Sequence, residues 1–191
     1  MADSENQSFA TLRRFSVGAL IVLALGSGLA WWAGLNLRSL APPPKMENPV
    51  SAQDPAIYGL GTEGQLVPQK VNLPAGLTPE AALQNRLVAL LNPPPGFASA
   101  VPSQTKLLGA RLTPQGIEVN LSPEFTGGGG SASQIARLGQ ILYTATQSDP
   151  NASLWLQVGG QPLETLGGEG LMVDQPLTRQ SFAENFELTA P

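Results

Sequence analysis

The sequence predicts an α+β fold: a two-layer sandwich with two helices on a small mixed sheet, preceded by one transmembrane helix. Three observations lead to this fold class: an uncharged apolar run, two segments with apolar residues at helical spacing, and an alternating apolar–polar segment. We divide the 191-residue chain into a short cytoplasmic N-terminus at 1–14, a transmembrane helix at 15–37, a proline-rich linker at 38–55 and a domain at 56–191.

The run from Phe15 to Leu37 contains no charged side chain. As a helix it would be roughly 34 Å long, enough to cross a hydrocarbon core of about 30 Å. Arg13 and Arg14 precede it, which favours a signal anchor with a cytoplasmic N-terminus and an extracytoplasmic, periplasmic-type location for the domain. Whether the segment is cleaved after Ala30 stays open. We expect a single-pass protein of a bacterial cytoplasmic (inner) membrane.

Composition excludes several classes of function. The chain has no cysteine and no histidine, and its 10 basic against 14 acidic residues give a net charge of −4. Disulfides, Cys/His zinc sites and Ser-His or Cys-His catalytic pairs are therefore excluded. Because phosphate-backbone binding needs a basic surface, we expect no nucleic-acid partner. We also expect no cofactor and no metal.

The proline run at 42–44 favours an extended, semi-rigid spacer. Two short strands are expected at 56–60 and 66–71. Thr78 as a cap and Pro79 at the first helical position then open a helix, which ends at the prolines after Asn92. Its apolar stripe consists of Leu83, Leu87, Leu90 and Leu91.

A hairpin follows, with its turn at 113–116, because apolar residues alternate with polar ones on both arms. The residues expected on its buried face are Leu108, Ala110, Leu112, Ile117, Val119 and Leu121. Ser131 to Gln134 fits a capping box and starts a second helix that ends near Asp149. Its apolar face consists of Ile135, Leu138, Ile141, Leu142 and Ala145. A strand at 154–158 and an irregular tail at 163–186 complete the domain.

Two glycine-rich loops and nearby charged residues are the candidate interaction surface. Its members are Glu124, Gly127, Gly128, Gly129, Gly130, Ser131, Arg137, Gly168, Glu169, Gly170 and Arg179. The amides at the helix start could hold an anion. The favoured interpretation is that the glycines permit a sharp turn with positive φ, while Ser131 caps the helix.

The second loop and the two arginines allow the same two interpretations. The glycines at 167–170 could form a binding rim or a tight turn packed against the first loop. The arginines could contact an anionic partner. We favour structural pairing with Glu124, Glu169 or Asp174, because arginine suits two-point contacts with carboxylates.

Four glutamates invite comparison with glycosidases, which divide acid and base roles between two carboxylates. They are Glu118, Glu124, Glu164 and Glu169. Such enzymes also need an aromatic-lined sugar cleft, and the few aromatic residues after the linker lie mostly where a core is expected. We therefore expect no catalytic residue.

Several segments between Thr78 and Phe182 resemble the GerMN domain family, which is named for sporulation and spore germination. They are Glu124-Phe125 followed by Gly127–Ser131, Ala136-Arg137 with Gln140 and Tyr143-Thr144, Val158–Gly160, Leu166–Gly170, and Pro176–Arg179. The resemblance implies a fold like the ring-building motifs of secretion-type channels, a membrane-anchored location outside the cytoplasmic membrane, and no catalytic residue. This chain has a single copy, whereas some members carry two in tandem. Nothing in the sequence shows that its host makes spores.

Taken together, we expect a non-enzymatic, membrane-anchored cell-envelope protein. Its extracytoplasmic domain would mediate protein–protein interaction or assembly, with envelope proteins or with itself. The alternative is a binding module for an anionic or peptidoglycan-derived ligand at the two glycine loops. A third hypothesis is a wall hydrolase.

Overall fold

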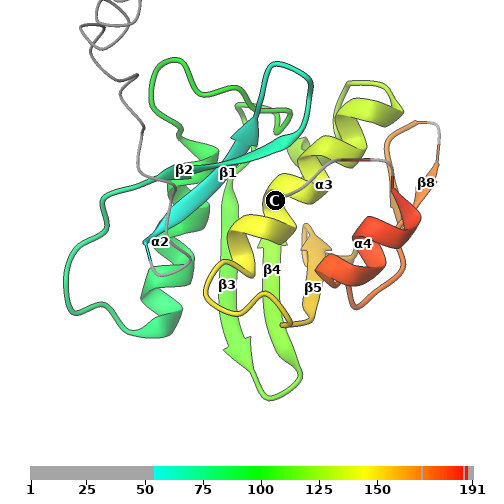
Figure 1. The fold of residues 1–191 in the computed structure, drawn as a ribbon. Helices are drawn as coiled ribbons and strands as arrows, with labels where there is room; N and C mark the ends of the chain where they lie inside the picture. The colour runs from blue at the N-terminus through cyan, green and yellow to red at the C-terminus, as the bar shows by residue number, and fades with distance from the viewer. Residues whose placement is uncertain (1–53, 169, 187, 189–191) are drawn as a thin grey trace, which may run out of the picture. The chain divides into compact units, whose positions relative to one another are not determined.

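The computed structural model describes residues 54–168, 170–186 and 188. The predicted N-terminal segment, transmembrane helix and nearly all of the linker lie outside these residues. Within the described part, no helix has both the length and the apolar character needed to span a membrane. The described elements form the α+β fold that the sequence predicts (Figure 1).

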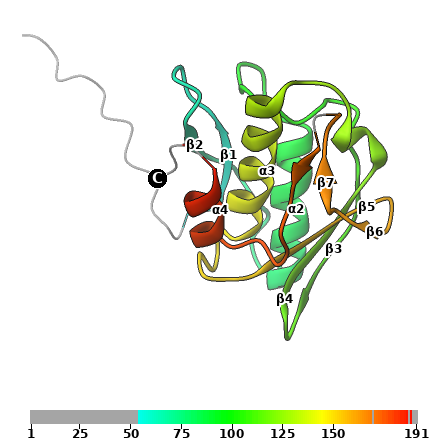
Figure 2. The same ribbon diagram turned by 90° about the vertical axis from the view of Figure 1, so that its right-hand side faces the viewer.

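A four-stranded mixed sheet forms one side of the domain (Figure 2). In order across the sheet, its strands are β3 (Leu107–Thr113), β4 (Gly116–Leu121), β5 (Leu154–Val158) and β6 (Gln161–Pro162). The β4–β5 pair is parallel and the other two pairs are antiparallel. A parallel pair needs a long crossover, which contains α3. The predicted hairpin and mixed sheet are confirmed.

Helices α2 (Pro79–Leu91) and α3 (Ser131–Ala145) cover the same face of this sheet (Figure 2). The predicted start of α2 is confirmed, because the Thr78 hydroxyl accepts a hydrogen bond of 3.2 Å from the Ala81 amide. The four leucines of the predicted stripe are all buried. Of the predicted apolar face of α3, Ile135 is half-buried and the other four residues are buried.

A second, separate sheet makes the domain three layers thick, which corrects the predicted two-layer sandwich. Strands β1 (Ala56–Leu60) and β2 (Leu66–Lys70) pair only with each other and lie on the far side of the helices (Figure 2). Two hydrogen bonds join β1 to α3: the Tyr58 amide donates to Thr144 Oγ1 (3.1 Å), and Gln140 Nε2 donates to the Tyr58 carbonyl (2.8 Å). The prediction considered only the apolar stripe of α3, whereas its polar face is buried as well.

The first arm of the hairpin departs from the predicted alternation. Only Ala110 is buried, whereas Leu108 and Leu112 are 53% and 44% exposed. Leu107 pairs with Leu121 and Gly109 with Asn120, so an extra residue at 108 interrupts the register. β3 is also an outer strand, so the helices cover it less completely than β4.

The tail is more regular than predicted. It contains β7 (Thr165–Leu166), β8 (Leu171–Met172) and α4 (Arg179–Asn185). A capping box between Thr178 and Ser181 starts α4, whose Phe182 is fully buried. A short 3₁₀ helix, η1 (Pro123–Thr126), also precedes the first glycine loop.

The second large helix is shorter than predicted. It ends at Ala145 instead of near Asp149. Both the amide and the hydroxyl of Thr146 donate to the Leu142 carbonyl, at 2.9 and 2.8 Å, and so close the last turn.

Candidate functional site

The first glycine loop joins η1 to α3 with a backbone that only glycine adopts easily. Gly128 and Gly129 have φ values of +62° and +78°, in the left-handed region that favours glycine. The predicted capping box is wrong, because Gly130 occupies the N-cap position and no side chain caps α3 there. Gly127 to Ser131 are exposed, so the loop presents its backbone to solvent.

Arg137 holds this loop from beneath. Its guanidinium donates to three carbonyl oxygens: Nη1 to Phe125 (2.7 Å) and Gly127 (2.9 Å), and Nη2 to Gly128 (2.9 Å). Because it is only 2% exposed, it is not part of an interaction surface, which corrects that prediction. Burial lowers the pKa of this guanidinium.

The preference for a structural role of Arg137 is supported, but its partners differ from those predicted. Among residues 54–168, 170–186 and 188 the ion pairs are Lys70–Asp54 and Arg111–Glu118, so neither Glu124 nor Asp174 pairs with it. Glu169 lies outside the described residues. Carbonyl dipoles of the loop take the place of a carboxylate.

Gln134 brings the two glycine loops together. Its Nε2 donates to the Gly129 carbonyl (3.1 Å), and a Cβ on Gly167 would collide with the same amide. Gly167 also has a positive φ of +74°. The tight-turn interpretation of the second loop therefore fits, and the loop packs against the first one through Gln134. Gly168 and Gly170 remain exposed beside it.

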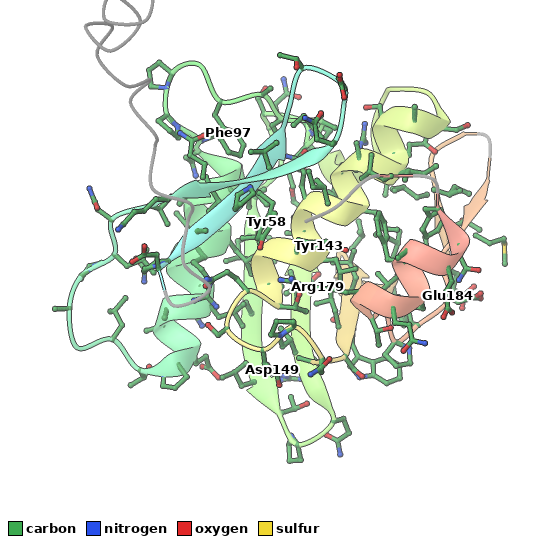
Figure 3. All side chains as sticks on the ribbon, in the orientation of Figure 1. Tyr58, Phe97, Tyr143, Asp149, Arg179 and Glu184 are labelled. Carbon is green, nitrogen blue, oxygen red and sulfur yellow. The ribbon has the colours of Figure 1, made fainter. Side chains whose placement is uncertain are left out.

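Arg179 fastens α4 to the end of α3 and is not a free surface cation. Its Nε donates to Thr146 Oγ1 (2.8 Å), and Nη2 donates to the carbonyls of Tyr143 (3.1 Å) and Thr146 (3.2 Å). The guanidinium also lies over the Tyr143 ring, 4.4 Å from its centroid, with Tyr58 at 5.6 Å (Figure 3). The predicted carboxylate pairing with Glu124 or Asp174 is wrong for this arginine too.

The described glutamates are not arranged for acid–base catalysis. Glu118 accepts a hydrogen bond of 2.9 Å from Arg111 Nε on the sheet. A hydrogen bond from the Ser122 side chain lowers the pKa of Glu124, with a smaller contribution from the charge of Lys106. A glycosidase acid instead needs a raised pKa. No group of three acidic residues within the described part could hold a metal ion.

Side chains bond backbone groups of two strands in the four-stranded sheet, β3 and β5. On the β3 edge, Glu80 Oε2 accepts from the Leu112 amide (3.2 Å), and Gln84 Nε2 donates to the Ala110 carbonyl (2.8 Å). Gln175 does the same for β5, where its Oε1 and Nε2 bond the amide (2.7 Å) and carbonyl (2.8 Å) of Leu156. Because these backbone groups are already paired, addition of a foreign strand is blocked at these positions.

Sequence reasoning missed the buried Arg86 and the half-buried Gln175, and assigned the buried Gln134 only to a capping box. Arg86 had a signal in the sequence, because it lies three residues after Leu83 and four before Leu90 and so falls on the apolar stripe of α2. Gln175 bonds β5, and Gln134 lies against the second glycine loop, and local patterns carry no trace of such contacts.

A family model described as Germane, "Sporulation and spore germination", matches residues 56–164. The chain belongs to this family. The Germane match contains the first glycine loop and the whole of α3, together with all four strands of the mixed sheet. It ends before α4, which Arg179 fastens to the rest of the domain.

Solved Germane structures share the fold. The first GerMN domain of the sporulation protein GerM from Bacillus subtilis gives a TM-score of 0.53 at 21% identity, covering 65% of this chain and 96% of that one. The tandem GerMN domains of the same protein give 0.52 at 21% identity, covering 66% and 46%. At these identities the likeness shows the fold alone. A comparison with curated proteins gave no match.

Proposed function

We propose that this protein is a non-enzymatic interaction module of the bacterial cell envelope. An N-terminal anchor at 15–37 would hold its Germane domain outside the cytoplasmic membrane, where it mediates protein–protein contact or assembly. The observation that supports this most directly is the pairing of two glycine loops. They come from distant parts of the chain, and Gln134 packs them side by side with their backbones exposed.

The rigidity of this paired-loop surface favours recognition of a folded partner. Here the paired-loop surface means Glu124, Gly127 to Ser131, Gly168 and Gly170, all exposed. Arg137 fixes the first loop by three bonds, so little conformational entropy is lost there on binding. A partner would meet such loops more readily than the positions of β3 and β5 whose backbone groups side chains already bond.

The same contacts favour this function over binding of an anionic ligand at the loops. That alternative would use Arg137 as a donor to the ligand. Both of its terminal nitrogens already donate to loop carbonyls. Capturing an anion there would mean breaking bonds that shape the loop.

The absence of native cysteine allows a direct test with single-cysteine variants of the full-length chain. Gly130→Cys and Gly168→Cys place the thiol on the paired-loop surface, where a new Cβ meets no atom within 4 Å. Gln115→Cys, at the exposed tip of the hairpin between β3 and β4, is the matched control. In native membranes, thiol cross-linking should give discrete adducts with the chain itself or with an envelope protein at the two loop positions.

Equal cross-linking at the loops and at the hairpin tip would contradict the proposed surface. The same control variant tests the location. A thiol reagent that does not cross the cytoplasmic membrane should label Gln115→Cys in cells whose outer layers are permeable to the reagent. Labelling only after the cytoplasmic membrane is broken would contradict an extracytoplasmic domain.

A further inference from the structure

Arg86 on α2 is a buried cation that no residue in the described part of the chain bonds. Its side chain is 4% exposed, and no hydrogen bond or ion pair among the described residues involves it. Its Nε is fully shielded and unbonded. Burial lowers the pKa of this guanidinium, and no neighbouring charge contributes to that shift.

A surface hollow of about 610 Å³ adjoins Arg86. Its lining combines apolar side chains with backbone and with two polar residues, Gln147 and Ser148. The apolar wall residues include Leu73, Pro74, Leu77 and Ala82. No residue of the paired-loop surface borders this hollow, so the two sites are separate.

The acidic groups on neighbouring elements are already engaged elsewhere. Asp54 pairs with Lys70 at 3.2 Å. Asp149 accepts from the Asn151 amide at 3.1 Å, and Glu80 accepts from the Leu112 amide at 3.2 Å. None of these contacts neutralises Arg86.

A desolvated charge without a counter-charge is among the least favourable arrangements in a folded protein. The guanidinium has parallel N–H donors that match the two oxygens of a carboxylate. Apolar walls next to such donors suit a molecule that combines a carboxylate with a small apolar body. We infer that the hollow beside Arg86 binds a carboxylate group carried on a small apolar body, as at the C-terminus of a short alanine-containing peptide.

The carboxylate belongs to a separate molecule, because the described acidic residues near the hollow are engaged elsewhere.

Calorimetric titration of the full-length chain with N-acetyl-alanyl-alanine tests the site, with N-acetyl-alanyl-alaninamide as the uncharged control ligand. For a ligand of this size, a Kd of about 1 mM is reasonable. We expect the amide to bind at least about tenfold more weakly, because charge-assisted hydrogen bonds are lost. Arg86→Met should weaken binding of the acid by a similar factor. Arg111→Met, which removes an exposed arginine on the sheet, should leave binding unchanged.

Equal binding of acid and amide, or no binding of either, would overturn the inference. If Arg86→Met does not fold, the comparison of acid with amide decides the matter alone.

Discussion

Arg86 and Arg137 are both buried arginines, but they differ in their hydrogen bonds. Both lie on the helices that cover the mixed sheet, and both are at most 4% exposed. The Nε of each is unbonded. Arg137 donates through Nη1 and Nη2 to three backbone carbonyls, two of them in the first glycine loop, whereas no hydrogen bond or ion pair among the described residues involves Arg86. Arg137 therefore contributes to the fold itself, while Arg86 carries a cost that the folded domain alone does not offset.

This contrast shows how the partners of a buried charge indicate its role. The carbonyls around Arg137 lie within twelve residues of it in the chain, so the loop and the arginine form one local unit. Arg86 instead borders a hollow. The hollow is also lined by residues that precede α2, such as Leu73 and Leu77, and by Gln147, which follows α3. An uncompensated cation at such a hollow is better explained by a ligand than by packing.

The largest expected effect comes from an apolar neighbour of Arg137 and sets the scale for the others. Leu138 is fully buried on α3. Leu138→Ala should lower the free energy of unfolding by roughly 2–5 kcal/mol, because it leaves a cavity in the core. Chemical denaturation measures this, and a loss under about 1 kcal/mol would mean that the core is not as tightly packed as described.

Removing the loop-holding arginine should cost somewhat less. Arg137→Met is expected to destabilise the domain by about 2–3 kcal/mol, since three carbonyls lose charged donors. Water can reach the exposed glycines, which limits the loss. A lower denaturation midpoint, with an unchanged dependence of the unfolding free energy on denaturant concentration, would measure this loss of stability. If Arg137→Met proves as stable as the unmodified chain, the distinction between the two arginines fails.

Removing the unpartnered arginine should cost little. Arg86→Met keeps most of the side-chain volume and removes an unpaired buried charge, so stability should stay within about 1 kcal/mol of the unmodified chain or rise. The measurement is the same denaturation experiment without added carboxylate. A loss comparable to that of Arg137→Met would show that Arg86 has a structural partner after all.

The smallest effect concerns the third arginine, Arg179, which lies over Tyr143. Burial raises the pKa of the Tyr143 hydroxyl, which Arg179 partly offsets. The folded state therefore keeps this proton to higher pH than the unfolded state, whose tyrosine ionises near pH 10. Stability should fall as pH rises from about 10 through the folded-state pKa. Between pH 9 and 11, the denaturation midpoint of Tyr143→Phe should therefore fall less steeply with pH than that of the unmodified chain. An equally steep fall in both proteins would contradict a contribution from Tyr143.

Local signals predicted the elements whose causes are local. Thr78 and Pro79 marked the start of α2, and alternating residues marked β4. Glycine content identified both loops at 127–130 and 167–170, because positive φ is a property of single residues. The mixed sheet followed from helix and strand order, since a helix between β4 and β5 allows them to be parallel.

Other features depended on partners far along the chain. The polar face of α3 looked solvent-exposed in sequence, yet Gln140 and Thr144 bond β1 more than eighty residues away. Likewise, Thr178 and Ser181 form a capping box at the start of α4, but so short a helix is stabilised mainly by the burial of Phe182 in the core. Arg137 and Arg179 were expected to pair with carboxylates, but in the structure both donate hydrogen bonds to backbone carbonyl oxygens.

The sequence by itself determined where the helices and strands lie and which two loops need glycine, because backbone conformation responds to neighbouring residues. Only the tertiary structure decided that a second sheet covers the helices, that Gln134 joins the loops, and that Arg86 bonds none of the described residues. Those outcomes depend on which distant groups come within bonding distance, and side-chain periodicity holds no information about that.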